Sequence, residues 1–419
     1  MKTQIIIAHP FKQHSFKTAM AIKKSGHSFK YITTVYAKKG SITYLIKKLI
    51  RGEYVKKINT HYCNELCDKE VIQFCELRGI IVLILRRINK NSYIYYKQYN
   101  KLLISFSKKV ADYATENNVK VVIMYDTLSH PAFKLIKEKK PCIKTIIDMS
   151  APFLPYMYDI YIKDTEQNME QSILLKDELS NNGYINNVKN SFEEIKWADY
   201  FISASEFTNK SLEFYGVRQD KIFLCRYGIN SNFFKSDLTA GIKKTDKDKL
   251  RCCYTGNINQ KKGMLILARV IESIDINRFS FTFIGRFDPN SDFYKKYKNT
   301  CRFTGFLNQD EIIKEYKNLD VMIFPSLADG FGNSVLEAMS CGLTAIVSSN
   351  AGISDIIIEG YNGFVVDIYD YEQIVQKLLM LKDKENLLKE LKLNAQKTAL
   401  SSKWQVYNNN ICNMLENLK

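Results

Sequence analysis

Two acidic side chains flank a glycine-rich turn within residues 324–342, which read FPSLADGFGNSVLEAMSCG. Asp329 precedes the turn, Gly330 and Gly332 lie within it, and Glu337 follows eight positions after Asp329. Glycines let a backbone approach a ligand closely, and the free N–H groups that begin a helix attract anions. A helix starting just after the second glycine would form a diphosphate cradle, with a carboxylate on either side to accept hydrogen bonds from hydroxyl groups. Such a set suits a nucleotide sugar, which carries hydroxyls on both sides of its diphosphate.

Short apolar runs alternate with amphipathic stretches along the chain, a pattern typical of βα units and parallel sheets. In the first half, strands are predicted at residues 4–8, 29–33, 120–125, 143–147 and 200–203, and helices at 16–24, 94–117 and 188–197. In the second half, strands are predicted at residues 251–255, 279–284, 321–324, 344–348 and 364–367, and helices at 263–273, 310–317, 334–340 and 371–381. Residues 35–95 favour helical insertions, and residues 152–185 look irregular.

This pattern predicts an α/β protein made of two Rossmann-like, doubly wound domains that face a central cleft. Open parallel sheets bind ligands beyond the carboxyl ends of their strands, so two facing sheets can hold one substrate each. The polar residues just before position 250 are typical of a linker. The expected division is an N-terminal domain at 1–228, a linker at 229–249 and a C-terminal domain at 250–400. Residues 401–419 are expected to form a helix that packs back toward the N-terminal domain.

The net charge of +17 is concentrated at the start of the chain, where residues 1–144 hold 28 Lys and Arg against 9 Asp and Glu. Such asymmetry favours an anionic partner: a membrane surface, an acidic substrate or nucleic acid. Residues 41–57 interleave apolar and basic side chains, which fits either a helix in an anionic lipid interface or a solvated helix. Nucleic acid is not expected, because no recognisable binding motif accompanies the charge.

No apolar run reaches the roughly 20 residues that cross a bilayer, and the apolar start at residues 5–8 is too short for a signal peptide. We therefore expect a cytoplasmic protein, with peripheral contact to the inner face of the membrane as an option. The ten cysteines show no four-ligand zinc spacing, so reduced thiols and no metal site are expected.

The acidic pair and its surroundings resemble the donor-site signature of retaining GT-B glycosyltransferases of family 4, the glycosyl transferases group 1. That signature places two glutamates eight apart around a Gly-Phe-Gly loop, and residues 338–346 (AMSCGLTAI), 352–356 (GISDI) and 360–367 (GYNGFVVD) resemble its flanks. Upstream, residues 255–263 (TGNINQKKG) resemble the turn in which the family places a phosphate-binding lysine, here Lys262. The resemblance is strong over about residues 198–368.

The resemblance implies a GT-B fold, with the acceptor in the N-terminal domain and the donor in the C-terminal domain. Lys262 would neutralise the diphosphate and Asp329 would hold donor-sugar hydroxyls, so these two are the implied catalytic residues. Glu337 would bind the ribose. The implied donor-binding set is Gly256, Lys262, Asp329, Gly330, Phe331, Gly332, Asn333, Ser334 and Glu337.

It also implies sugar transfer with retention, and neither a metal nor a cofactor. The co-substrate would be a UDP- or GDP-linked sugar, and the acceptor a glycan or a lipid-linked glycan. Synthesis of a surface polysaccharide, such as lipopolysaccharide or capsule, or of a glycolipid would be the expected setting.

The chain departs from the family pattern at several positions. Asp329 stands where the family has Glu, and Asn257 stands where it often has an arginine, for which Arg286 could substitute. The first loop, residues 9–15, lacks the usual glycine pair. Asp148 stands near a common family histidine and either contacts a sugar or caps a turn. His9 and His130 have no assigned role.

These departures favour one alternative, a non-catalytic GT-B-like binding or accessory protein. The other alternative is a GT-B-fold epimerase or a phosphorylase-like enzyme acting on sugars, for which the sequence shows neither the acid/base set nor the cofactor lysine.

Overall fold

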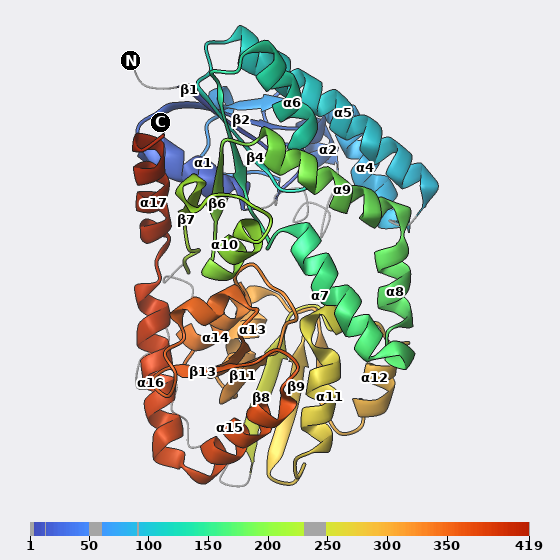
Figure 1. Cartoon of the computed structure of the whole chain (residues 1–419), viewed down its shortest axis with the longest axis vertical. Coiled ribbons are helices and arrows are strands. Elements are labelled where there is room, and N and C mark those ends of the chain that lie inside the picture. The colour runs from blue at the N-terminus through green and yellow to red at the C-terminus, as the bar shows by residue number, and fades with distance from the viewer. Residues whose placement is uncertain (1–3, 13, 50–60, 90–91, 230–248, 419) are drawn as a thin grey trace.

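The computed structural model describes residues 4–12, 14–49, 61–89, 92–229 and 249–418, and contains two parallel β-sheets flanked by helices (Figure 1). The N-terminal sheet has the order β3-β2-β1-β4-β5-β6-β7. The strands are β1 (Gln4–Ala8), β2 (Ser28–Thr33), β3 (Val71–Gln73), β4 (Val121–Tyr125), β5 (Lys144–Asp148), β6 (Tyr200–Ser203) and β7 (Ile222–Leu224). The helices of this domain are α1 (Ser15–Lys24), α2 (Ile42–Leu49), α4 (Glu76–Asn89), α5 (Tyr93–Glu116), α6 (His130–Lys139), α7 (Leu154–Gln167), α8 (Ile173–Ser180), α9 (Asn182–Trp197) and α10 (Glu206–Glu213).

The C-terminal sheet has the order β10-β9-β8-β11-β12-β13, again with every pairing parallel. The strands are β8 (Leu250–Thr255), β9 (Phe279–Ile284), β10 (Arg302–Gly305), β11 (Val321–Phe324), β12 (Thr344–Ser348) and β13 (Gly363–Val366). The helices are α11 (Met264–Glu272), α12 (Asp292–Tyr297), α13 (Gln309–Tyr316), α14 (Asn333–Ser340), α15 (Tyr371–Asp383), α16 (Glu385–Ser401) and α17 (Trp404–Glu416), with short 3₁₀ turns η4 (Gln260–Lys262) and η5 (Gly352–Ile356). The predicted α/β class with two doubly wound domains is confirmed.

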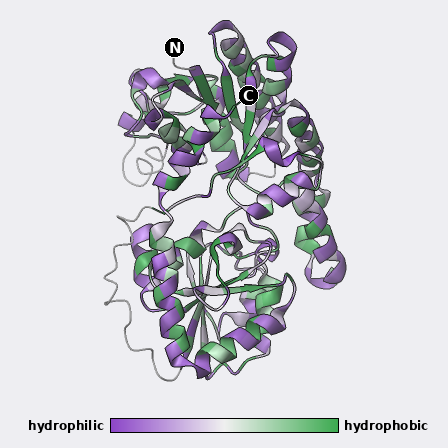
Figure 2. Cartoon of the chain, turned by 60° about the vertical axis from the view of Figure 1, so that its left-hand side comes forward, coloured by the Kyte–Doolittle hydropathy of each residue, from purple (hydrophilic) through white to green (hydrophobic). Residues whose placement is uncertain are grey.

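The strands form because their apolar runs are covered by helices on both faces. Ile5, Ile6 and Ile7 of β1 are all fully buried, and β11 and β12 are buried throughout. Figure 2 shows the same distribution, with hydrophobic residues along the strands and hydrophilic residues on the outer faces of the helices. Continuous apolar strands of this kind are typical of parallel sheets that are covered on both faces.

The expectation that residues 152–185 are irregular is wrong, because they form α7, α8 and the start of α9. Figure 1 shows α7 running from the N-terminal domain to the side of α11 in the C-terminal domain. Gln260 donates hydrogen bonds to Asp164 and Ser172, both at 2.6 Å, and Lys261 pairs with Glu178 at 2.7 Å. The buried face of α7 includes the polar residues Asp164 and Thr165 beside Tyr161, so the helical period of apolar residues is weak there.

The chain passes between the domains twice, and the two passages lie side by side. The Ile229 N–H donates to the Ser402 carbonyl at 2.8 Å, and a β-carbon on Gly228 would lie 2.2 Å from the Trp404 nitrogen. Beyond this passage α17 packs against α1 (Figure 1), where the Tyr407 hydroxyl lies 2.9 Å from that of Thr18. The predicted linker, residues 229–249, falls almost wholly outside the described residues.

In the described part of the chain, no helix combines the length and the apolar character that crossing a bilayer requires. The ten cysteines are free thiols, and half of them are buried.

Candidate active site

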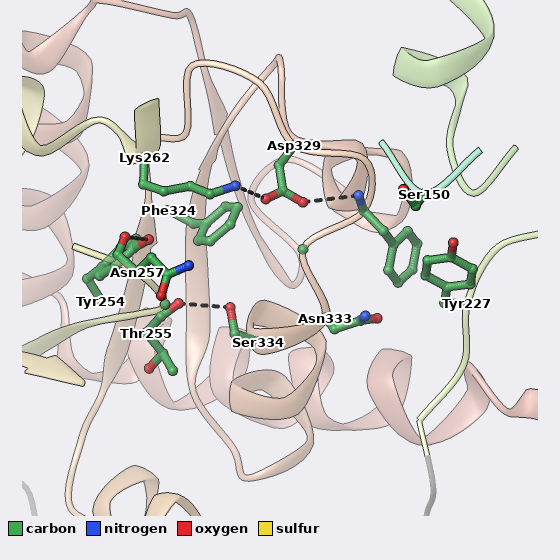
Figure 3. A pocket seen from close by; sticks show the side chains of 13 residues that line it. Ser150, Tyr227, Tyr254, Thr255, Asn257, Lys262, Phe324, Asp329, Asn333 and Ser334 are labelled. Carbon is green, nitrogen blue, oxygen red and sulfur yellow. Dashed lines mark hydrogen bonds and ion pairs between the residues drawn. The ribbon is translucent and has the colours of Figure 1, made fainter. Parts of the chain in front are cut away.

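A cavity of about 300 Å³ lies between the two domains, beyond the carboxyl ends of their central strands. The N-terminal domain contributes Ser150 and Tyr227 to its wall. The C-terminal domain contributes the end of β8, the η4 turn and the start of α14 (Figure 3). The lining residues from that side are Tyr254, Thr255, Gly256, Asn257, Lys262, Phe324, Asp329, Phe331, Gly332, Asn333 and Ser334.

The start of α14 opens into this cavity. Gly332 precedes the helix in a left-handed conformation (φ 96°), which is costly for any residue with a β-carbon, and no side chain in the described part of the chain caps the helix start. The first N–H groups of α14 and the positive end of its dipole therefore face the cavity, and none of the residues that the structure describes caps them with a side chain. Ser334 fixes the helix start on the sheet, because its hydroxyl donates to the Thr255 carbonyl at 3.0 Å (Figure 3).

Lys262 reaches the same wall from η4. The next residue, Gly263, is left-handed (φ 79°), and a β-carbon on it would lie 2.0 Å from the Pro325 carbonyl oxygen. Only glycine allows this close crossing of two loops, which brings Lys262 to the segment that carries Asp329. Its neighbour Lys261 turns the other way, over the rings of Tyr161 and Tyr184.

The two residues implied to be catalytic form an ion pair. The Lys262 ammonium lies 2.5 Å from the Asp329 carboxylate, whose second oxygen accepts the Phe331 N–H at 3.1 Å (Figure 3). Residues 350–352 hold the Asp329 backbone, through bonds to the Asn350 carbonyl and the Gly352 N–H. The carboxylate is thus fixed between a cation and a backbone amide, one short loop away from the start of α14.

Glu337 lies one helical turn beyond the cavity wall. Burial raises the pKa of its carboxyl from 4.5 to about 7, and none of the described residues hydrogen-bonds to that carboxyl group. Gly330 is also outside the lining set, because its backbone lies against the N-terminal domain: a β-carbon on it would approach the Ser150 oxygen and the Ala151 α-carbon to 2.9 Å. The other seven residues of the implied donor set all line the cavity.

Arg286 does not replace the missing family arginine at this wall. Its guanidinium lies over the Phe306 ring, 5.1 Å from the centroid, and it is not among the lining residues. Asn257 does line the cavity, and the Tyr254 hydroxyl donates to its carbonyl at 3.0 Å. Asn257 therefore adds polar groups to this wall, but no charge.

On the N-terminal side, Asp148 ends β5 inside a buried polar network. His14 precedes α1, and its Nε2 lies 2.8 Å from the Asp148 carboxylate, which also accepts the Thr18 hydroxyl at 2.7 Å. The hydroxyl of Tyr227 lies 3.2 Å from the same His14 nitrogen, and the Tyr227 ring contacts the Phe331 ring across the cavity. The turn-cap interpretation of Asp148 is wrong, because its partners are a histidine and a buried hydroxyl.

Ser150 is held at the cavity by Asp126, which accepts its N–H at 2.8 Å and its hydroxyl at 2.7 Å. Burial raises the pKa of the Asp126 carboxyl in spite of these bonds. Sequence reasoning missed both His14 and Ser150. Each follows a predicted strand closely, so the rule that ligands bind beyond the carboxyl ends of strands would have selected them.

The two unassigned histidines lie outside the cavity wall. His9 is buried, its Nδ1 accepts the Phe11 N–H at 2.9 Å, and burial lowers its pKa to about 3, so it is neutral. His130 is in the first turn of α6, and burial lowers its pKa. Among the described residues, no three His, Cys, Asp or Glu side chains gather as a metal site.

Residues 237–398 match the family model of glycosyl transferases group 1. The sulfoquinovosyl transferase SQD2 of Arabidopsis thaliana is 32% identical over 162 residues, which cover 38% of this chain and 31% of that protein. The N,N'-diacetylbacillosaminyl-diphospho-undecaprenol alpha-1,3-N-acetylgalactosaminyltransferase of Campylobacter jejuni is 26% identical over 227 residues, covering 49% of this chain and 57% of that protein. The chain thus spans only about a third to three fifths of these relatives. The resemblance inferred from residues 198–368 is confirmed at the level of group 1.

Solved structures match over the whole chain at low identity. The sucrose-phosphate synthase of Thermosynechococcus elongatus superposes with a TM-score of 0.66 at 14% identity, covering 99% of this chain and 98% of that one. HepE of Anabaena, in complex with UDP-glucose, gives a TM-score of 0.62 at 13% identity, covering 99% of this chain and all of that one. The fold is therefore GT-B.

Proposed function

We propose that this protein is a retaining, metal-independent glycosyltransferase that moves a sugar from a UDP- or GDP-linked donor to a glycan or lipid-linked acceptor. One observation carries the proposal: Lys262 and the uncapped start of α14 lie on the same wall of a cavity between two GT-B domains. A cation and a set of N–H groups at one place suit a diphosphate. The group 1 match over residues 237–398 supports this assignment.

In the proposed reaction, the bond between the anomeric carbon and the diphosphate oxygen breaks, and the diphosphate keeps the electron pair. Fixed positive charge near that oxygen stabilises the transition state, and Lys262 with the N–H groups of α14 would supply it without a metal ion. Asp329 would exchange its bond to Lys262 for hydroxyls of the donor sugar. An acceptor hydroxyl would then form the new bond on the face that the diphosphate leaves and pass its proton to the departing diphosphate oxygen, which preserves the anomeric configuration.

The acceptor class follows from the relatives and from the charge of the chain. The Campylobacter jejuni relative is named for a diphospho-undecaprenol acceptor, and another relative, from Staphylococcus aureus, for capsular polysaccharide biosynthesis. The strong basic excess of residues 1–144 suits an acceptor of that kind, held at the anionic inner face of a membrane. We therefore place the protein in the synthesis of a cell-surface polysaccharide or glycolipid, in the cytoplasm or peripherally on the membrane.

A non-catalytic sugar-nucleotide-binding protein is the second candidate. It is favoured by the position of Arg286, which leaves Lys262 as the only Lys or Arg among the lining residues. Such a protein would bind a nucleotide sugar without turnover.

The test is a panel of UDP- and GDP-sugars, with melting temperature and nucleotide release as readouts. We expect one donor to raise the melting temperature, because a ligand at 100 times its Kd stabilises the folded state by about 2.7 kcal/mol. Lys262→Met should lower kcat/KM for that donor by about 100-fold or more.

Lys261→Met is the matched control, because Lys261 adjoins Lys262 but pairs with Glu178 instead of Asp329. It should keep most of the activity. Equal losses in the two variants would contradict the role of Lys262, and binding without nucleotide release in the native protein would select the non-catalytic candidate.

A further inference from the structure

Large apolar side chains are exposed along one face of α4. Leu77, Ile81, Ile84 and Ile88 are between 41% and 76% exposed. Their spacing of four, three and four positions places them in one row on a helix. Apolar rows of this kind normally pack against a protein core, whereas this row is exposed to solvent.

A second exposed apolar row lies on α2, which contacts α4. Ile42, Leu45 and Leu49 are between 41% and 83% exposed. The Glu76 carboxylate at the start of α4 accepts the Thr43 N–H at 2.8 Å and the Thr43 hydroxyl at 2.6 Å, which fixes the two helices together. We refer to these seven side chains on α2 and α4 as the α2–α4 apolar surface. Single exposed apolar residues are ordinary, but a contiguous set marks an interaction surface.

Beyond Glu76, the charge of α4, and of α5 as far as residue 111, is of one sign. Residues 77–111 contain eight Lys and Arg and no Asp or Glu. Arg86 and Arg87 on α4, and Lys97, Lys101 and Lys108 on the neighbouring α5, are exposed. Figure 1 shows α4 and α5 side by side on the outer edge of the N-terminal domain, away from α16 and α17.

We propose that the α2–α4 apolar surface inserts into the interfacial region of an anionic lipid bilayer, with the basic residues of α4 and α5 in contact with its headgroups. An aliphatic row bordered by cations matches the two layers of such an interface: acyl chains below and anionic groups above. A second copy of this chain would bring the same positive charge to the contact, and a nucleic acid has no complement for seven aliphatic side chains. This surface would be the part of the protein that binds the membrane in the peripheral location proposed above. Such binding does not depend on the transfer reaction.

The test is flotation of the full-length protein with vesicles of phosphatidylcholine alone or mixed with phosphatidylglycerol. We expect the protein to float with the mixed vesicles and to remain unbound with pure phosphatidylcholine. The triple variant Ile81→Gln, Ile84→Gln and Ile88→Gln should reduce the bound-to-free ratio by about tenfold or more, because partitioning scales with the apolar area that is inserted. High salt should weaken binding of the native protein, since it screens the headgroup attraction.

The matched control replaces Met169, Ile173 and Leu174 with Gln. These side chains are 64% to 71% exposed, near and on α8, away from the basic edge. The control should float like the native protein, and both triple variants should keep the native melting temperature. Native protein that does not float, or an α4 variant that floats as well as the control, would overturn the proposal. An α4 variant that only converts a dimer to a monomer would assign the surface to a second copy instead.

Discussion

At the scale of single residues, the site contains an ion pair and, close to it, a carboxyl group without a hydrogen-bond partner among the described residues. Lys262 and Asp329 neutralise each other, so the proposed nucleotide-sugar donor would have to separate them to use the positive charge of one and the acceptor atoms of the other. Glu337 lies deeper and has no hydrogen-bond partner for its carboxyl group within the described residues. A half-buried acid without a partner makes the free protein less stable than it could be, and such groups are common at functional sites.

The variant Glu337→Gln tests this loss of stability, because the free energy of unfolding should depend on pH differently in the variant and the parent. Burial raises the pKa of the Glu337 carboxyl to about 7, so the folded protein holds that proton more tightly than the unfolded chain does. The free energy of unfolding must therefore fall as pH rises from about 4.5 to about 7. The variant does not titrate there, and without nucleotide it should exceed the parent in stability by about 2 kcal/mol at pH 8 and by much less near pH 5. Urea unfolding at the two pH values measures this, and an equal difference at both would show that the carboxylate is solvated.

At the scale of elements, loop crossings position the site. The η4 turn lies against the segment after β11 at Gly263. The loop after Asp329 lies against the N-terminal domain at Gly330. Both crossings leave no room for a β-carbon, which explains why the cavity wall depends on glycines whose side chains take no part in chemistry.

Gly330→Ala should separate activity from stability. The added β-carbon would lie 2.9 Å from the Ser150 oxygen and the Ala151 α-carbon, so the donor loop and the N-terminal domain must move apart. We expect kcat/KM to fall by about 100-fold, as a displacement of about 1 Å can cause, with a stability loss of about 1–3 kcal/mol. Gly342→Ala, at the far end of α14, is the control: its backbone is left-handed (φ 87°) but nothing lies within 4 Å, so it should lose stability without losing activity. Comparable activity losses in the two variants would contradict a role for the domain contact.

The sequence predicts those strands whose buried residues form a continuous apolar run. Every central strand was predicted within about one residue, because its apolar run is long and bounded by turns. The edge strands β3, β7 and β10 were missed, since three or four half-buried residues give no periodic signal. Lys262 and the α14 loop could be found because each lies in a short segment that resembles the family signature, whereas His14 and Ser150 reach the cavity only through the topology of the sheet.

At the scale of the whole molecule, the last helix stabilises the first domain. α17 follows α16 of the C-terminal domain, yet it packs on α1 and places Tyr407, Ile411 and Met414 in the buried core. The two domains are thus linked by the two chain segments that pass between them and by the packing of α17 on α1.

Ile411→Ala should therefore destabilise the N-terminal domain. Removing a fully buried isoleucine side chain costs about 2–5 kcal/mol. Hydrogen exchange should show the loss in β1 and α1, with little change in β11 and α14. Val406→Ala, which is half exposed on the same helix, should change stability by less than about 0.5 kcal/mol. Loss of protection centred on the C-terminal sheet would contradict this assignment of α17.

The paired passages at Ile229 and Ser402 have a mechanical consequence. A hydrogen bond joins the two adjacent passages, so a sliding movement of one lobe past the other would have to break it, whereas a swing about the passages would not. Figure 1 places α7 and α8 at the opposite edge, where Gln260 holds Asp164 and Lys261 holds Glu178. A swing of the lobes about the paired passages would therefore have to break these polar bonds at the opposite edge.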